Sequence, residues 1–124
     1  YEVLSSIDFS PDAMDDRSSK RLNAVISFIS QNQHRSISVD EMAKLCNLST
    51  PAFCRWFKQV FKTSFVSYMT ARRVDLACHL LETSSLGVSL IGDRVGFDSY
   101  SNFNRAFTKL KSVPPREYRK FATA

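Results

Sequence analysis

Glycine and proline are scarce in this chain, which has three glycines and four prolines in 124 residues. So few turn-forming residues argue against an all-β fold, which needs many short strands and tight turns. A glycine-rich phosphate-binding loop is also excluded, because the chain has glycine only at Gly87, Gly92 and Gly96. The remaining patterns are helical, and the sequence predicts an all-α protein of seven helices without a strand.

Cysteines and long apolar runs are also few. The three cysteines, Cys46, Cys54 and Cys78, are odd in number and form no C-x-x-C pair, so no disulfide framework is implied. No apolar run is long enough to span a bilayer, and no signal-peptide core is present. We therefore expect a cytoplasmic protein that does not use a membrane. The start at Tyr1 rather than Met suggests a fragment whose missing part precedes residue 1.

The residue groups that catalysis or metal binding require are missing as well. His34 and His79 have no Cys or His at ligand spacing, so we expect no metal and no cofactor. Cys54 has no His or Asp at a position that would mark a nucleophile, which leaves a thiol-dependent enzyme as an alternative without support. We expect no catalytic residue and no enzymatic activity.

Charge is unevenly distributed along the chain. The formal net charge is +5, yet residues 1–19 hold five acidic residues against Arg17 and so carry −4, which leaves +9 on residues 20–124. A basic body of this kind attracts polyanions, of which nucleic acid is the commonest. We interpret residues 1–17 as an acidic linker from a missing upstream domain.

A short internal repeat is the most informative feature. The hexapeptide at 53–58, FCRWFK, returns at 103–108 as FNRAFT. The frames around the copies also match: residues 42–49 correspond to 91–98, and residues 64–68 to 114–118. A short helix, a tight turn and a second helix with an outward Arg is the pattern of a helix-turn-helix. The sequence thus predicts two such units, about 18–63 and 84–124, joined by a long helix at about 64–83.

Local signals place the helix ends. Ser38 and Glu41 form a capping box, Asn47 suits a left-handed turn residue, and Gly96 suits a left-handed cap. Ser18 or Ser19 is expected to cap the first helix. The long helix carries Arg72, which either braces the units against Asp75 or a helix end, or stays exposed.

Helical periodicity divides each second helix into two faces. At about 50–61 an apolar stripe contains Phe53 and Phe57, and Arg55 falls on the opposite side. At about 100–111 the expected inward residues are Phe103, Phe107 and Leu110, and Arg105 again faces out. An outward face of short polar and cationic residues fits a major groove roughly 12 Å wide.

Arg pairs well with guanine and Asn with adenine. The residues alone therefore nominate Arg55, Asn104 and Arg105 as base contacts, with Cys54 near a thymine methyl. The expected phosphate contacts are cationic residues and helix-capping serines: Arg35, Ser38, Lys44, Lys58, Lys62, Ser99, Lys109 and Lys111. The plain alternative for the outward Arg residues is a solvated surface, and a helical protein-interaction module without DNA binding stays open as a second function.

These motifs resemble the DNA-binding domain of the AraC/XylS family of bacterial transcription regulators. The resemblance is carried by residues 88–107, VSLIGDRVGFDSYSNFNRAF, and by the closing Pro115, Tyr118 and Arg119. In the first half it runs through Ile37-Ser38-Val39, Met42-Ala43, Leu48-Ser49, Phe57-Lys58 and 77–81. The match covers about residues 20 to 121.

The resemblance implies two helix-turn-helix units that read adjacent major grooves of double-stranded DNA. The base-contacting positions it implies are Pro51, Cys54, Arg55, Tyr100, Ser101, Asn102, Asn104 and Arg105. It further implies sequence-specific, nucleoid-associated DNA binding, an upstream sensor or dimerisation domain, and RNA polymerase as the partner of an activator.

Four positions depart from that family pattern. Lys62, Ser112 and Asn47 stand where the family often has Gly, and Gly92 stands where it usually has Ala. We expect altered C-caps or slight strain after both reading helices. We also expect a looser second unit, because Gly92 costs about 1 kcal/mol of helix propensity.

Overall fold

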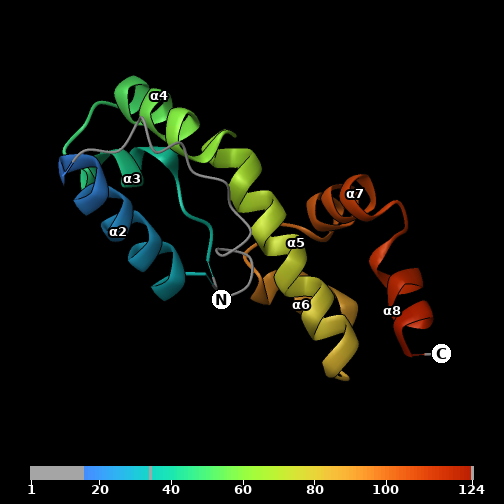
Figure 1. The fold of residues 1–124 in the computed structure, drawn as a ribbon. Helices are drawn as coiled ribbons and strands as arrows, with labels where there is room; N and C mark the ends of the chain where they lie inside the picture. Colours follow the sequence, from blue (N-terminus) through green and yellow to red (C-terminus); the bar gives the residue numbers. More distant parts are fainter. Residues whose placement is uncertain (1–15, 34, 124) are drawn as a thin grey trace. The chain divides into compact units, whose positions relative to one another are not determined.

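The computed structural model describes residues 16–33 and 35–123, which form seven α-helices and no strand (Figure 1). The helices are α2 (Asp16–Gln31), α3 (Val39–Leu45), α4 (Thr50–Phe61), α5 (Phe65–Thr83), α6 (Val88–Arg94), α7 (Tyr100–Lys111) and α8 (Pro115–Thr123). The all-α prediction of seven helices is confirmed. Most of the predicted acidic linker, and His34, lie outside the described residues.

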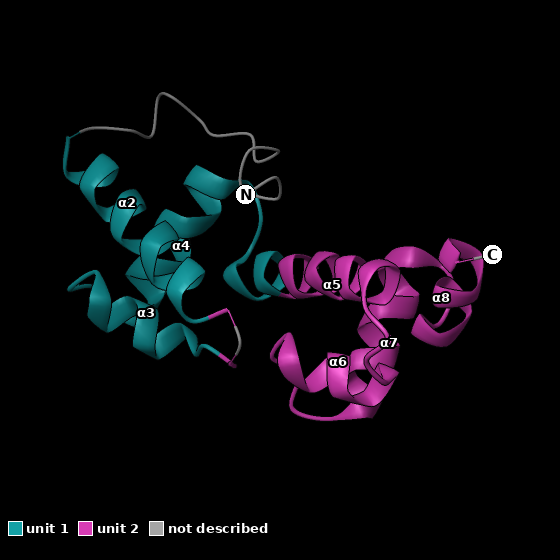
Figure 2. Ribbon diagram, turned by 90° about the horizontal axis from the view of Figure 1, so that it is seen from below, with its two compact units in different colours: residues 1–32, 37–69 teal, residues 33–36, 70–124 magenta. Residues whose placement is uncertain are grey.

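The chain divides into two compact units (Figure 2). Among the described residues, the first unit holds 16–32 and 37–69, and the second holds 33, 35–36 and 70–123. Helix α5 begins in the first unit and continues through the second from Thr70. Each unit has a helix-turn-helix and a hydrophobic core of its own.

An aromatic cluster fills the core of the first unit. Phe53 and Phe57 of α4 are fully buried, and they contact Phe65 and Tyr68 of α5 edge to face. Such ring pairs add about 0.5–1.5 kcal/mol beyond the area that they bury. The cluster therefore fixes which side of α4 faces inward.

The expected cap at Ser18 is wrong. Helix α2 already includes Asp16, and Ser18 is a buried residue within it. The Ser18 hydroxyl accepts a 2.7 Å hydrogen bond from the indole Nε1 of Trp56. Because a buried indole N–H needs an acceptor, Ser18 joins α2 to α4 instead of capping α2.

The second unit packs α6 and α7 against α5. Val74 and Leu81 of α5 are fully buried, as are Ile91 of α6 and Phe103 of α7. The open question of Arg72 is settled, because its side chain is only 1% exposed. It donates a hydrogen bond to Gln33 Oε1 at 3.1 Å and so ties Gln33 to α5 within this unit.

The two helix-turn-helix turns use the same backbone hydrogen bonds. The N–H of Leu48 donates to the carbonyl of Ala43, and the N–H of Phe97 donates to the carbonyl of Gly92, at 2.9 and 3.0 Å. Four residues separate α3 from α4, whereas five separate α6 from α7. This one-residue difference explains why the repeat spacing changes from 49 residues before the turn to 50 after it.

Four residues in the described chain have a left-handed backbone. Asn47 (φ 57°) and Gly96 (φ 103°) lie in the two turns, as predicted. Lys62 (φ 65°) and Ser112 (φ 69°) end α4 and α7, and their N–H groups donate to the carbonyls of Lys58 and Thr108. Both helices thus keep a left-handed cap although neither cap residue is glycine, which costs roughly 1–2 kcal/mol at each site.

Gly92 allows a close contact between α6 and α7. A Cβ at this position would lie 2.7 Å from Cδ2 of Phe103, and the Phe103 ring is fully buried. The ring therefore fills the space that an alanine methyl would need. The missing side chain is part of the packing and not only a loss of helix propensity.

We predict that Lys62→Gly stabilises the chain by about 0.5–1 kcal/mol. Glycine removes the left-handed penalty at φ 65° but gains unfolded-state entropy, and the two effects offset in part. Urea unfolding followed by circular dichroism gives the free energy of unfolding. Gln59→Gly, in the exposed interior of α4, is the control and should lose stability; equal losses in both variants would contradict the prediction.

Gly92→Ala is expected to destabilise the second unit by on the order of 1 kcal/mol. Overpacking against Phe103 costs about 1–3 kcal/mol, which exceeds the roughly 1 kcal/mol gained in helix propensity. Thermal unfolding should show a lower midpoint for Gly92→Ala and no loss for Ser89→Ala, an exposed site on the same helix. A gain in stability at Gly92 would mean that Phe103 moves aside without cost.

Candidate nucleic-acid interface

Helix α4 presents the predicted polar face of the first unit to solvent. Ser49 caps the helix, and its hydroxyl accepts a 3.2 Å hydrogen bond from the N–H of Ala52. Pro51, Cys54 and Arg55 are all exposed. Pro51 and Arg55 lie on the side opposite the buried Phe53, and Cys54 lies at the margin of that side. The structure therefore leaves all three predicted residues accessible on one helix.

Helix α7 has the same construction in the second unit. The Ser99 hydroxyl caps it by accepting a 3.1 Å hydrogen bond from the N–H of Asn102. Tyr100, Ser101, Asn102 and Arg105 are exposed, whereas Asn104 is half-buried and lies at the margin of the face. Asn104 is therefore the least accessible of the predicted base contacts on this helix.

One predicted inward residue of α7 is placed wrongly. Leu110 has the spacing of the stripe of Phe103 and Phe107, yet its side chain is 48% exposed. It lies in the last turn of α7, two residues before the left-handed Ser112. The core of the second unit ends at Phe107 on this helix, so the apolar period continues past the core.

Arg105 has a partner on its own helix. Its Nη1 donates a 3.2 Å hydrogen bond to Oδ1 of Asn102, one turn earlier. An amide oxygen carries two lone pairs, so Oδ1 of Asn102 can still accept a second hydrogen bond. In this arrangement Asn102 orients the guanidinium of Arg105.

The predicted phosphate contacts lie in different settings. Lys44, Lys58, Lys62 and Lys109 are exposed, and Ser38 caps α3 through the predicted capping box with Glu41. Arg35 is half-buried and donates to the carbonyl of Ser36. Lys111 forms a 3.4 Å ion pair with Asp75 of α5, so it is held in place and partly neutralised.

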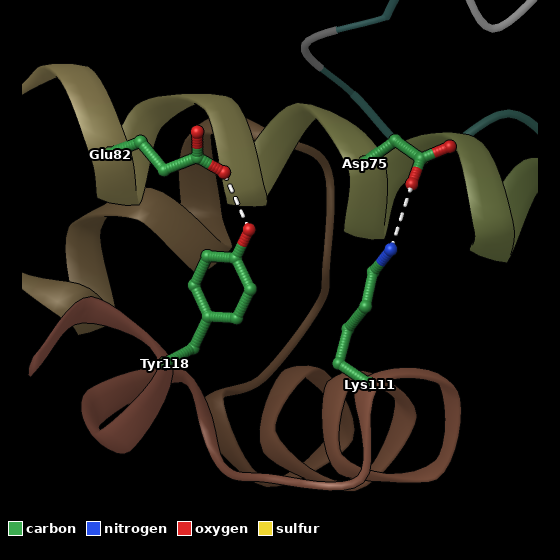
Figure 3. Close-up of polar contacts among 4 residues, drawn as sticks. All are labelled: Asp75, Glu82, Lys111 and Tyr118. Atoms are coloured by element: carbon green, nitrogen blue, oxygen red, sulfur yellow. Dashed lines mark hydrogen bonds and ion pairs between the residues drawn. The ribbon is translucent and has the colours of Figure 1, made fainter. Parts of the chain in front are cut away.

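Two polar contacts attach α7 and α8 to α5 (Figure 3). Asp75 and Glu82 project from α5, the first to Lys111 and the second to the hydroxyl of Tyr118, which donates to Glu82 Oε2. The ring of Tyr118 also meets the ring of Phe107 edge to face at 5.4 Å. These contacts fix α7 from the side opposite its exposed face.

Arg119 completes the attachment of α8. Its guanidinium donates to the carbonyls of Leu81 and Ser84 at 3.3 and 3.2 Å, at the end of α5. A cation at a helix C-terminus meets unpaired carbonyls and the negative end of the helix dipole. The closing Tyr118 and Arg119 therefore anchor the last helix.

An open hollow of about 630 Å³ adjoins the exposed face of α7. It is lined by Gly87, Val88, Ser89, Tyr100 and Arg116. Arg116 is not among the predicted site residues. The repeat gives no signal for it, because its counterpart Val66 is apolar and no motif marks the position.

The cysteines do not form a reactive site. Burial raises the pKa of the Cys46 and Cys78 thiols, which keeps both neutral. Cys54 is free and exposed, as expected of a surface thiol. Within the described residues, no group of three or more His, Cys, Asp or Glu residues is arranged to hold a metal ion.

Known proteins share this pattern. A helix-turn-helix domain family model matches residues 42–120. The transcriptional activator RclR of Escherichia coli K12 is 29% identical over 99 residues, which are 80% of this chain and 35% of RclR. A regulator structure from Chromobacterium violaceum, described as AraC-type, is 27% identical with a TM-score of 0.73, covering 86% of this chain and 95% of that one.

The chain belongs to the AraC/XylS family of helix-turn-helix DNA-binding domains. The same fold occurs in the DNA-binding domain of AdpA, solved with a target DNA, at 24% identity and a TM-score of 0.76 over 86% of this chain and 92% of that one. The relatives are transcription regulators, in accord with a domain without catalytic activity. The chain spans only about a third of the length of RclR.

The departures from the AraC/XylS pattern have structural answers. Lys62 and Ser112 adopt the left-handed cap that the family usually gives to glycine. Gly92 receives the Phe103 ring in place of the usual alanine methyl.

No helix in the described part of the chain is long and apolar enough to cross a membrane.

Tyr118→Phe should flatten the loss of stability at alkaline pH. Two effects raise the pKa of Tyr118 above its usual value near 10: the hydrogen bond to Glu82, which is the larger, and burial. Above that pH the unfolded state loses the proton while the folded state keeps it, so stability falls as pH rises. Chemical unfolding between pH 9 and about pH 11 should show a shallower decline in Tyr118→Phe. The control Tyr100→Phe, at an exposed tyrosine of α7, should decline like the wild type.

Proposed function

We propose that this AraC/XylS domain reads double-stranded DNA with both α4 and α7, each placed in a major groove, and that the two grooves are adjacent. The observation that carries this proposal is the matched pair Arg55 and Arg105. Each is exposed on a capped helix whose opposite face is a fully buried pair of phenylalanines. Two outward guanidiniums at equivalent positions suit guanine recognition better than a general solvated surface.

The basic charge supports binding to a polyanion. Residues 20–124 carry +9, and exposed lysines accompany both reading helices. Lysines at phosphates supply much of the affinity of such domains, and their contribution falls steeply as salt rises. We assign this role to Lys44, Lys58, Lys62 and Lys109, and a weaker one to Lys111 because Asp75 already pairs with it.

The regulatory setting follows the relatives. RclR is named a transcriptional activator, and its length leaves room for further domains. We propose that this domain likewise works within a longer bacterial regulator at the nucleoid, that an upstream sensor or dimerisation domain controls it, and that it activates transcription through RNA polymerase.

Selection of bound duplexes from a random pool tests the DNA-reading proposal. Two reading helices predict two short informative blocks about one helical turn, or 10 base pairs, apart. A single block would contradict reading by the second helix. Absence of any mobility shift with duplex DNA at low salt would overturn DNA binding and favour the protein-interaction module.

Arg55→Ala and Arg105→Ala are each expected to lose about 1–3 kcal/mol of binding at one base position. The loss should vanish when that base pair is changed, because the contact is then missing in the wild type too. Competition binding against single-base-pair variants of the selected site measures it. Lys58→Ala is the control and should weaken binding to all sequences alike.

Asn102 supplies a second arm of this test. If it orients Arg105, Asn102→Ala affects the same base pair as Arg105→Ala, and the double variant loses less than the sum of the two. If Arg55→Ala or Arg105→Ala weakened binding equally at all base pairs, that Arg would be a phosphate contact and not a base contact. Separate base positions for Asn102 and Arg105 would show that Asn102 reads a base directly.

A further inference from the structure

The hollow beside α7 is lined by one cationic residue and two hydroxyl-bearing residues, together with Gly87 and Val88. Arg116 brings a guanidinium, and Ser89 and Tyr100 bring hydroxyls that can donate hydrogen bonds. All three residues are exposed, so the hollow opens to solvent. Gly87 leaves its rim free, since a Cβ at that position would meet no atom within 4 Å.

The position of the hollow relates it to the reading helix. Tyr100 is the first residue of α7 and directly precedes Ser101 on the exposed face. Val88 and Ser89 open α6, the first helix of the same helix-turn-helix. In helix-turn-helix complexes the start of the second helix enters the groove while the first helix crosses the DNA backbone. If α7 enters a groove in this way, as proposed above, the hollow is expected to face the DNA backbone.

Arg116 is held at this place by the start of α8. Pro115, the first residue of α8, is buried, and Tyr118 and Arg119 tie the next turn to α5. The backbone of Arg116 is thus fixed, while the Arg116 side chain remains exposed. A guanidinium on a fixed backbone is well suited to bidentate contact with a phosphate.

We propose that this hollow seats one phosphodiester of the DNA backbone, with Arg116 as the charged contact and Tyr100 and Ser89 as hydroxyl donors. The proposal rests on the DNA-binding function proposed above. It adds a phosphate contact on α8, outside the helix-turn-helix. It also turns Tyr100 from a base contact into a backbone contact.

The test compares Arg116→Ala with Arg94→Ala in the 124-residue chain. Arg94 is exposed in the last turn of α6, at the end opposite the hollow, so it controls for loss of one positive charge. Affinity for the selected duplex is measured over a range of salt concentrations. Arg116→Ala should bind roughly tenfold more weakly at low salt. Its log–log salt slope should be shallower by about 0.9, without a change in base preference.

A methylphosphonate scan then locates the phosphate. Neutral methylphosphonates replace single phosphates along the second block of the site. One position should weaken binding of the wild type and of Arg94→Ala but leave Arg116→Ala unaffected. Arg116→Lys should keep most of the salt slope of the wild type. If Arg116→Ala does not fold, Arg116→Gln replaces it in the comparison with Arg94→Ala.

The outcomes separate the two proposals. Equal affinity and slope in Arg116→Ala and Arg94→Ala, with normal duplex binding by the wild type, would overturn the phosphate seat alone. A changed preference at one base pair in Arg116→Ala would also overturn it, because Arg116 would then read a base. A wild-type chain that binds no duplex at low salt would instead overturn the DNA-binding function.

Discussion

The orientation of the reading helices depends on the burial of two pairs of phenylalanines. Phe53 and Phe57 on α4, and Phe103 and Phe107 on α7, are fully buried. Residues four apart share one side of a helix, so the residue midway between them must face the other side. Burial of one such ring contributes about 1.5–3 kcal/mol, far more than any preference of an exposed Arg. The outward position of Arg55 and Arg105 is therefore a consequence of the core.

Each reading helix is also braced from outside its own helix-turn-helix, and the two braces differ. Trp56 of α4 donates to the buried Ser18 of α2, while Arg21 lies over the indole ring at 5.3 Å. Among the described residues, α7 shows no counterpart of this contact, because Ala106 stands at the position of Trp56. Instead, Phe107 packs on Tyr118 of α8, whose hydroxyl donates to Glu82. The repeat thus duplicates the reading element but not its support. The two helices can consequently differ in stability while they share one pattern of outward residues.

Local signals were enough to predict the helices, the capping box at Ser38, the left-handed Asn47 and the exposed Arg residues. Contacts between residues distant in sequence were not predictable. Ser18 has the form of a cap, but its partner is Trp56, 38 residues away. No local pattern indicates that Arg72 is buried, and its side chain donates a hydrogen bond to Gln33, which is 39 residues away in sequence. The prediction for Leu110 is wrong for the opposite reason. Leu110 has the helical spacing of Phe103 and Phe107, but the core ends before α7 does.

Gly92 links the packing of the second unit to its reading face. Because the Phe103 ring occupies the space beside Gly92, α7 lies closer to α6 than an alanine would permit. Phe103 stands between Asn102 and Asn104 and two residues before Arg105, so a shift of the α7 backbone at Phe103 moves the exposed face as well. A shift of about 1 Å is enough to spoil hydrogen bonds whose useful range is only some 0.5 Å wide. Gly92 costs helix propensity in α6, but it also lets the fully buried Phe103 ring pack directly against α6, two residues before Arg105.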